Sequence, residues 1–121
     1  MTITAFIPLK KFSSRLPNKN FLPIGGKPLY THLPRTLVKS SLIHNVVVYS
    51  SCEEFKNDLP NGAEFIKRPA YLDDDTVTGD QIYEEFINSY HSDYYLLAHA
   101  TSPFLKLESI ELAIKNVING K

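Results

Sequence analysis

The sequence predicts an α/β protein in which helices cover both faces of a mainly parallel β-sheet. Two observations lead to this fold class. Short apolar runs rich in β-branched residues alternate with segments whose apolar residues recur at helical spacing, and such alternation is typical of parallel sheets. Polar segments also follow three of the apolar runs directly, and ligands of parallel sheets bind beyond the carboxyl ends of the strands.

The first half of the chain contains two predicted strands and one predicted helix. Residues 3–8 are apolar and end in proline, and this run is too short for three helical turns, so it predicts a buried strand. Apolar residues recur at helical spacing from 28 to 41, where Pro34 is expected to kink the helix or delay its start. The β-branched run 45–50 predicts a second strand that is buried on both faces.

The second half continues the alternation. A short polar helix is expected over residues 53–58, and a Pro-Asn-Gly turn leads from it to a third strand at 64–67. An amphipathic helix is predicted over residues 78–91. A fourth strand at 94–100 and a last helix ending at Gly120 complete the pattern.

Side chains of the predicted helix 78–91 indicate how it begins and what it buries. Thr78 or Asp80 could cap its start, because either side chain can accept a hydrogen bond from the free N–H groups of the first turn. Phe86 and Tyr90 fall on its apolar face. The tyrosines at 83, 90, 94 and 95 lie at apolar helical or strand positions and are therefore expected in core packing rather than in stacking against a base.

Length and composition exclude several classes of protein. A chain of 121 residues is the size of one domain, so residues 1–121 are expected to form a single unit. Its 13 basic and 13 acidic residues lack the positive field of a nucleic-acid-binding protein. The single cysteine, Cys52, fits a reducing compartment. Without a signal sequence or a run of about 18 apolar residues, the protein is expected to be soluble and cytoplasmic, with no membrane partner.

The residue types that commonly bind metals do not form a metal-site pattern here. The histidines at 32, 44 and 91 are too scattered to form a zinc site with the single cysteine. The acidic run Asp73-Asp74-Asp75 could suggest a cation site, but solvated side chains are the expected reading for Asp73 and Asp74. No metal-ligating residue is predicted in the chain.

Three polar segments are expected to share one edge of the sheet, because each follows a predicted strand: residues 9–20, 68–80 and 99–103. The first segment combines cations with hydroxyl groups, which together could surround a phosphate chain. Its charged and hydroxyl residues are Lys10, Lys11, Ser13, Ser14, Arg15 and Lys19. The alternative is a solvated basic loop, since charge runs usually lie on the surface.

These segments resemble the acylneuraminate cytidylyltransferases, also called CMP-sialic acid synthetases. Residues 7–20, I-P-L-K-K-F-S-S-R-L-P-N-K-N, and the later G-G-K-P-L at 25–29 are similar to the family's opening I-P-A-R-x-G-S-K-R-L-P-x-K-N and its G-G-K-P-L. The resemblance resumes with K-R-P-A-Y-L at 67–72, with Asp75-Thr76 and with H-A-T-S-P at 99–103. In the family these stretches read L-R-P-A-E-L, D-T and Q-P-T-S-P, and the R-L-P-x-K-N element separates this group from the enzymes that activate ketodeoxyoctonate.

The resemblance implies a fold and a reaction. The fold would be the Rossmann-like, three-layer α/β/α nucleotidyltransferase fold, with this chain as the N-terminal, nucleotide-binding half of a longer family domain. The reaction would transfer CMP from CTP to a sialic-acid-type, nine-carbon 2-keto sugar acid, with release of pyrophosphate and help from Mg²⁺. The family's metal-binding carboxylates belong to a second half, so Mg²⁺ here would be held by the nucleotide phosphates. A homo-oligomer is expected, because an isolated half would expose a face that is normally covered.

The resemblance also implies roles for individual residues. Lys10 and Lys19 take the catalytic positions. The implied nucleotide-binding residues are Leu9, Lys10, Ser13, Ser14, Arg15, Lys19, Asn20, Arg68, Thr78 and Gly79, with Arg68 at the cytidine end. The implied sugar-binding residues are His99, Thr101 and Ser102.

Four positions depart from the family pattern. Lys10 replaces an arginine and loses its planar fork, Phe12 replaces a flexible glycine, Ser14 replaces a lysine, and His99 replaces an amide. These changes leave an alternative open, and so does the location of the family's metal-binding carboxylates in a second half. In that alternative the chain is a non-catalytic nucleotide-binding or self-associating relative of the enzymes.

Overall fold

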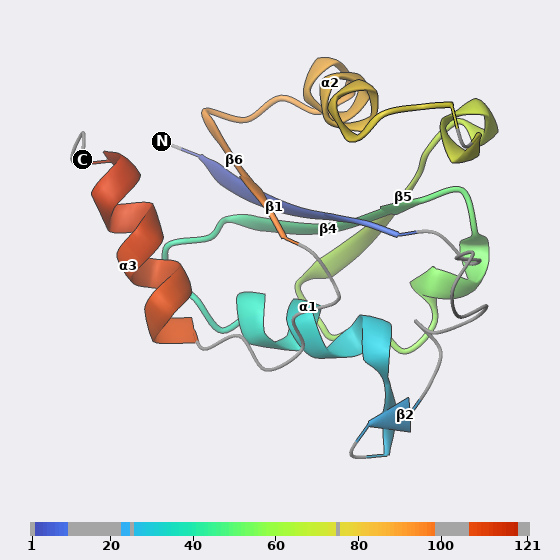
Figure 1. The fold of residues 1–121 in the computed structure, drawn as a ribbon. Helices are drawn as coiled ribbons and strands as arrows, with labels where there is room; N and C mark the ends of the chain where they lie inside the picture. The colour runs from blue at the N-terminus through green and yellow to red at the C-terminus, as the bar shows by residue number, and fades with distance from the viewer. Residues whose placement is uncertain (1, 10–22, 25, 75, 99–106, 119–121) are drawn as a thin grey trace.

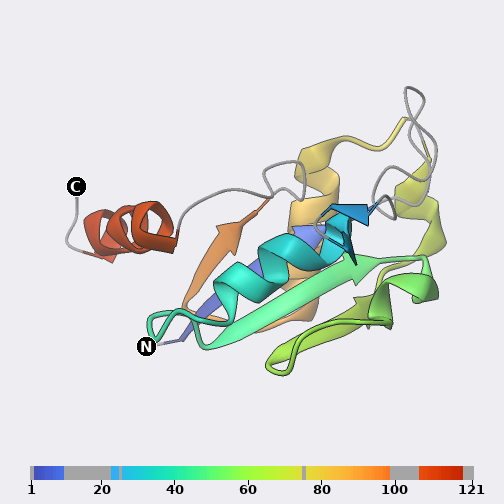
Figure 2. The same ribbon diagram turned by 90° about the horizontal axis from the view of Figure 1, so that it is seen from below.

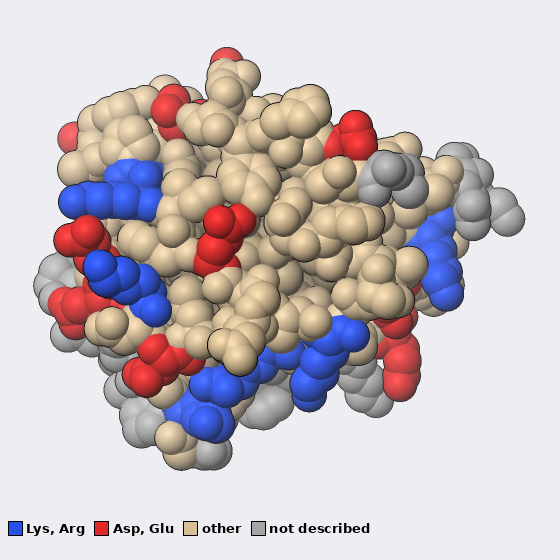
Figure 3. Space-filling view, turned by 180° about the vertical axis from the view of Figure 1, so that it is seen from behind, with Lys and Arg blue, Asp and Glu red and all other residues tan. Residues whose placement is uncertain are grey.

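The structure is a computed structural model, and it describes residues 2–9, 23–24, 26–74, 76–98 and 107–118. None of the described helices is both long enough and apolar enough to cross a membrane. On the face that Figure 3 shows, acidic and basic side chains are scattered among uncharged ones, as the equal numbers of the two charges suggest.

A four-stranded parallel sheet forms the middle layer of the molecule (Figure 1). Its strands are β1 (Ile3–Pro8), β4 (Asn45–Ser50), β5 (Ala63–Lys67) and β6 (Tyr94–Leu97). Their order across the sheet is β5-β4-β1-β6, and every neighbouring pair is parallel. Along the chain, β4 and β5 therefore lie on one side of β1, and β6 lies on the other side. The strand order reverses at β1, which is the position where open α/β sheets bind ligands.

Helices cover both faces of this sheet, as predicted. On one face lie α1 (His32–Leu37) and α3 (Leu107–Ile118), and on the other lies α2 (Gly79–Ser89), as Figure 1 shows. Figure 2 views the molecule from the α1 side, where the arrows of the parallel strands point the same way. Short connections include the 3-10 helices η2 (Leu29–Thr31), η3 (Glu53–Lys56) and η4 (Ala70–Asp73) and the small hairpin of β2 (Pro23–Ile24) and β3 (Lys27–Pro28).

Side chains of β1 alternate between two separate cores. Ala5 and Ile7 point to the face of α1 and α3 and join a largely aliphatic cluster. Phe6 points to the opposite face, where it stacks on Phe86 of α2 with the ring centroids 4.3 Å apart. Phe86 also contacts the rings of Tyr49, Tyr90 and Tyr95. The tyrosines at 83, 90 and 95 pack against this aromatic core, as expected, and Tyr49 belongs to it as well. Tyr94 was also expected in core packing, but it is 37% exposed.

Several predicted boundaries are corrected by the structure. The helix predicted over 28–41 is a 3-10 turn followed by only six α-helical residues, and Pro34 occupies the first turn of α1, where the missing N–H costs little. Pro34 thus delays the start of the helix. The helix expected over 53–58 is the single 3-10 turn η3. The fourth strand ends at Leu97, and the hairpin of β2 and β3 was not predicted.

Candidate functional site

The carboxyl ends of the four strands lie at one edge of the sheet. Backbone hydrogen bonds between neighbouring strands continue for one residue beyond these ends. The N–H of Leu9 donates to the carbonyl of Tyr49, and that of Ala98 donates to the carbonyl of Phe6, both at 3.0 Å. Arg68 N–H likewise donates to the Ser50 carbonyl at 3.0 Å. The polar segments predicted from the sequence therefore follow strands that are held in register at this edge.

Arg68, Asp73 and Ser51 form a hydrogen-bonded cluster where β4 and β5 end. Arg68 is only 2% exposed, and its Nε and Nη2 donate to Asp73 Oδ1 at 3.2 and 2.7 Å. The hydroxyl of Ser51 donates to Oδ2 of the same carboxylate. The turn of η4 brings Asp73 back over Arg68, so the expectation that Asp73 is simply solvated is wrong.

The phenol of Tyr49 adds an uncharged polar group near this cluster. Burial and, to a smaller extent, the negative charge of Glu85 raise the pKa of Tyr49 to about 12, and the Arg68 guanidinium acts in the opposite direction. The Tyr49 phenol is therefore protonated at neutral pH. Nearby, the Tyr71 hydroxyl donates to Glu85 Oε2 at 3.2 Å.

Thr78 and Gly79 form the start of α2. The Gln81 N–H donates to Thr78 Oγ1 at 3.3 Å, and the Thr78 N–H donates to Gln81 Oε1 at 2.8 Å, which is a reciprocal capping box. This confirms Thr78 rather than Asp80 as the N-cap. At Gly79 a Cβ atom would lie 3.2 Å from the hydroxyl oxygen of Tyr83, so a side chain there would press on that tyrosine. Both residues have structural roles besides the predicted nucleotide contacts.

Replacing Thr78 by alanine is expected to lower the free energy of unfolding by about 1 kcal/mol, because the hydroxyl that accepts from the Gln81 N–H is lost. Chemical denaturation monitored by circular dichroism would measure the change. Thr78→Ser keeps a hydroxyl at the same position and is expected to retain most of the stability. An alanine variant as stable as the parent would contradict the capping role.

The structure places only part of the predicted site. Leu9 is 4% exposed and belongs to the aliphatic core, and its N–H donates to the Tyr49 carbonyl. Its nucleotide contact stays a prediction. The other predicted residues lie outside the described part of the chain and remain predictions. They are Lys10, Ser13, Ser14, Arg15, Lys19, Asn20, His99, Thr101 and Ser102.

Asp73 and Ser51 are members of the site that the sequence did not single out as functional. Asp73 lies in a run of three aspartates, and nothing local shows which of them turns inward. Among the described residues, no three His, Cys, Asp or Glu side chains gather as a metal-binding group would.

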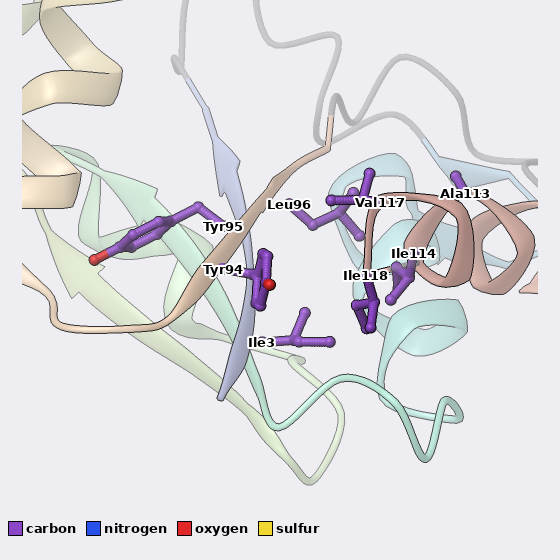
Figure 4. Close-up of a pocket in the computed structure, with 8 residues that line it drawn as sticks. All are labelled: Ile3, Tyr94, Tyr95, Leu96, Ala113, Ile114, Val117 and Ile118. Atoms are coloured by element: carbon purple, nitrogen blue, oxygen red, sulfur yellow. The ribbon is translucent and has the colours of Figure 1, made fainter. Parts of the chain in front are cut away.

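An apolar pocket lies at the opposite edge of the sheet, between β6 and α3 (Figure 4). Ile3 and Tyr94, which begin β1 and β6, line it together with Ala113, Ile114 and Val117 of α3. Its lining contains no charged side chain. A pocket of this composition at the amino ends of the strands does not suit a triphosphate, which leaves the carboxyl edge as the candidate site.

Known proteins resemble this chain over nearly its whole length. The family described as cytidylyltransferase matches residues 4–121. The chain is 31% identical over 117 residues to a 3-deoxy-manno-octulosonate cytidylyltransferase from Chlorobium luteolum, covering 95% of this chain and 45% of that protein. It is 30% identical over 129 residues to a CMP-N,N'-diacetyllegionaminic acid synthase from Legionella pneumophila, covering 100% of this chain and 56% of that protein.

A solved structure shows the same fold. CMP:2-keto-3-deoxy-manno-octonic acid synthetase complexed with CTP superposes with a TM-score of 0.83 at 21% sequence identity, covering 98% of this chain and 48% of that one. The chain thus spans about half the length of the relatives that it matches.

Proposed function

Since this chain belongs to the cytidylyltransferase family, we propose that it forms the nucleotide-binding half of an enzyme that transfers CMP from CTP to a sialic-acid-type 2-keto sugar acid and releases pyrophosphate. The relatives named above act on several sugar acids, and the finer assignment depends on residues 15–20, R-L-P-N-K-N, which resemble the sialic-acid group of enzymes.

The strand order is the observation that supports this proposal most directly. Arg68 follows β5, the basic segment 10–20 follows β1, and the segment 99–103 follows β6, while the strands lie in the order β5-β4-β1-β6. The three predicted subsites therefore follow strands in the order base, triphosphate and acceptor sugar. Attack on the α-phosphate of CTP requires the acceptor hydroxyl to approach on the side opposite the departing pyrophosphate, and subsites that follow neighbouring strands at one end of the sheet are compatible with that approach.

The chemistry proposed for this edge is mainly positioning and neutralisation of charge. The anomeric hydroxyl of the sugar acid attacks the α-phosphorus, a new phosphorus–oxygen bond forms, and the bond to pyrophosphate breaks. Lys10 and Lys19 would stabilise the negative charge on the phosphate oxygens. Mg²⁺, which the family resemblance implies, would be held by the nucleotide phosphates and would supply additional positive charge there.

Calorimetric titration of the chain with CTP and Mg²⁺ would test nucleotide binding. Lys19→Ala is expected to weaken CTP binding about tenfold or more, because a charge-assisted contact to phosphate is lost. Lys115→Ala is the matched control: Lys115 is an exposed lysine of α3, and its loss is expected to leave the affinity unchanged. A parent chain that does not bind CTP, or a Lys19→Ala variant that binds like the parent, would overturn the proposal.

Pyrophosphate release would test the acceptor. We expect faster release with N-acylneuraminic or N,N'-diacetyllegionaminic acid than with 3-deoxy-manno-octulosonic acid, and the reverse preference would overturn the assignment to sialic-acid-type substrates. Tight CTP binding without release for any acceptor would instead favour a non-catalytic nucleotide-binding role for this chain.

A further inference from the structure

We propose that Asp73 and Ser51 are positioning residues that orient the Arg68 guanidinium at the base end of the nucleotide site and so set the preference for cytosine over uracil. This inference rests on the proposed function, and it deepens that function by assigning base discrimination to a specific hydrogen-bonded cluster.

The carboxylate of Asp73 is held from two strands. Its Oδ1 accepts from both Nε and Nη2 of Arg68, which follows β5, while its Oδ2 accepts from the hydroxyl of Ser51, which follows β4. The backbones of these strands are joined at the same place, because the Arg68 N–H donates to the Ser50 carbonyl at 3.0 Å. The two contacts of Oδ1 occupy one edge of the planar guanidinium and restrict its rotation.

The nitrogen Nη1 of Arg68 takes no part in the contacts with Asp73. A guanidinium has five N–H donors and stays charged in proteins. The hydrogen bonds to Asp73 involve Nε and Nη2 of Arg68. The residue as a whole is 2% exposed. Because Nη1 lies outside the contacts with Asp73, it is the nitrogen that we assign to a hydrogen bond with the base of the ligand.

Cytosine and uracil differ at the pyrimidine edge. The pyrimidine edge of cytosine has hydrogen-bond acceptors at both O2 and N3, whereas N3 of uracil carries a hydrogen and is a donor. An N–H donor that is held in a fixed orientation toward this edge therefore favours cytosine and opposes uracil. If the guanidinium could turn freely, it would still attract any polar ligand, but it would lose this discrimination.

A positioning role of Asp73 and Ser51 differs from a purely structural role in its effect on ligand binding. A buried ion pair is by itself weak evidence for a stabilising role, although removing one partner can destabilise the fold. A structural role would change the affinity for every ligand together or change none. A positioning role changes the affinity for CTP relative to UTP and leaves the binding of inorganic tripolyphosphate unchanged, because tripolyphosphate has no base.

The test measures dissociation constants of CTP, UTP and inorganic tripolyphosphate for the parent chain and for Asp73→Asn and Ser51→Ala. We expect Asp73→Asn to reduce the ratio of CTP to UTP affinity about tenfold. Ser51→Ala keeps the ion pair and removes only the hydroxyl donor, so it is expected to act in the same direction by a few-fold. Tripolyphosphate binding should stay within about twofold of the parent for both variants.

Two further variants sharpen the test. Asp93→Asn removes the same charge at the amino edge of the sheet, where Asp93 accepts from the Thr2 N–H, and it should leave the CTP to UTP ratio unchanged. In an Arg68→Ala background, adding Asp73→Asn should not lower the ratio further, because Asp73 would act only through Arg68. Thermal unfolding of each variant would show that the chain is folded when the ligands are measured.

The possible results have different consequences. Equal weakening of all three ligands, or an unchanged CTP to UTP ratio in Asp73→Asn and Ser51→Ala, would overturn the positioning role. A parent chain that binds tripolyphosphate but does not distinguish CTP from UTP would also overturn it, while the phosphate-binding part of the proposed function would stand. A parent chain that binds none of the three ligands would overturn both proposals.

Discussion

Replacing Phe86 by alanine is expected to lower the free energy of unfolding by about 3–5 kcal/mol, a large part of the total stability of a single domain. Phe86 is fully buried and is the buried side chain of α2. Its ring stacks on Phe6 at 4.3 Å and on Tyr90 at 5.3 Å and meets Tyr49 edge-on at 5.1 Å. The substitution would leave a cavity between α2 and the sheet that these rigid rings cannot readily fill.

Urea denaturation followed by circular dichroism would measure this loss. Ile87→Ala is the matched control, because Ile87 is the next residue of the same helix and is 45% exposed, so a change within about 0.5 kcal/mol is expected. A Phe86→Ala variant within about 1 kcal/mol of the parent would show that the aromatic cluster does not hold α2. Because α2 begins at the capping box of Thr78, loosening this helix should also disturb the carboxyl edge where nucleotide binding is proposed.

Raising the pH from 10 to 12 is expected to remove about 2 kcal/mol of stability through Tyr49 alone. Burial raises the pKa of Tyr49 in the folded chain from 10.0 to about 12, with a further contribution from Glu85. The pKa of Tyr90 is also raised to about 12. The causes are burial, the hydrogen bond that its hydroxyl donates to Glu64 at 2.7 Å, and the negative charge of Glu64.

The sign follows from the order in which the two states lose their protons. Below pH 10 both states keep these phenols protonated, so the contribution to stability is fully present. Above pH 10 the unfolded chain ionises first, and the contribution decreases until the folded phenols ionise near pH 12. Maximum stability is therefore expected below pH 10.

Equilibrium unfolding at several pH values between 8 and 12 would test this dependence. Tyr49→Phe should flatten the decrease because the ionisable group is gone, whereas Tyr94→Phe, at an exposed tyrosine of β6, should keep the slope of the parent. An identical slope in the Tyr49→Phe variant would contradict the assignment.

Local sequence patterns predicted most of the elements correctly. The β-branched run 45–50 became β4, a strand with five of its six side chains buried, because such residues suit a strand covered on both faces. The sequence placed the cap of α2 at Thr78 or Asp80, and the capping box between Thr78 and Gln81 shows that it is Thr78. The pattern failed for residues 28–41, where the apolar spacing suggested a long helix but a 3-10 turn and Pro34 left only six residues in α1.

The candidate site was predictable only in part. The motifs in 7–20 and 67–72 identified the family and the segments concerned, and the match of the cytidylyltransferase family to residues 4–121 confirms that identification. The contacts of Lys10, Lys19 and His99 remain predictions because these residues lie outside the described part of the chain. The inward turn of Asp73 was missed, since three consecutive aspartates give no local sign of which one meets a buried cation.

The sequence by itself thus determined the types of most elements and the family, because each of these depends on residues that are near one another in the chain or on short motifs. Only the tertiary structure decided that β1 lies between β4 and β6, and that Arg68 and Ser51 share the carboxylate of Asp73. The physical reason is that strand order and register bring together residues that are far apart in sequence, and the hydrogen bonds across that sheet edge form only once the strands are aligned.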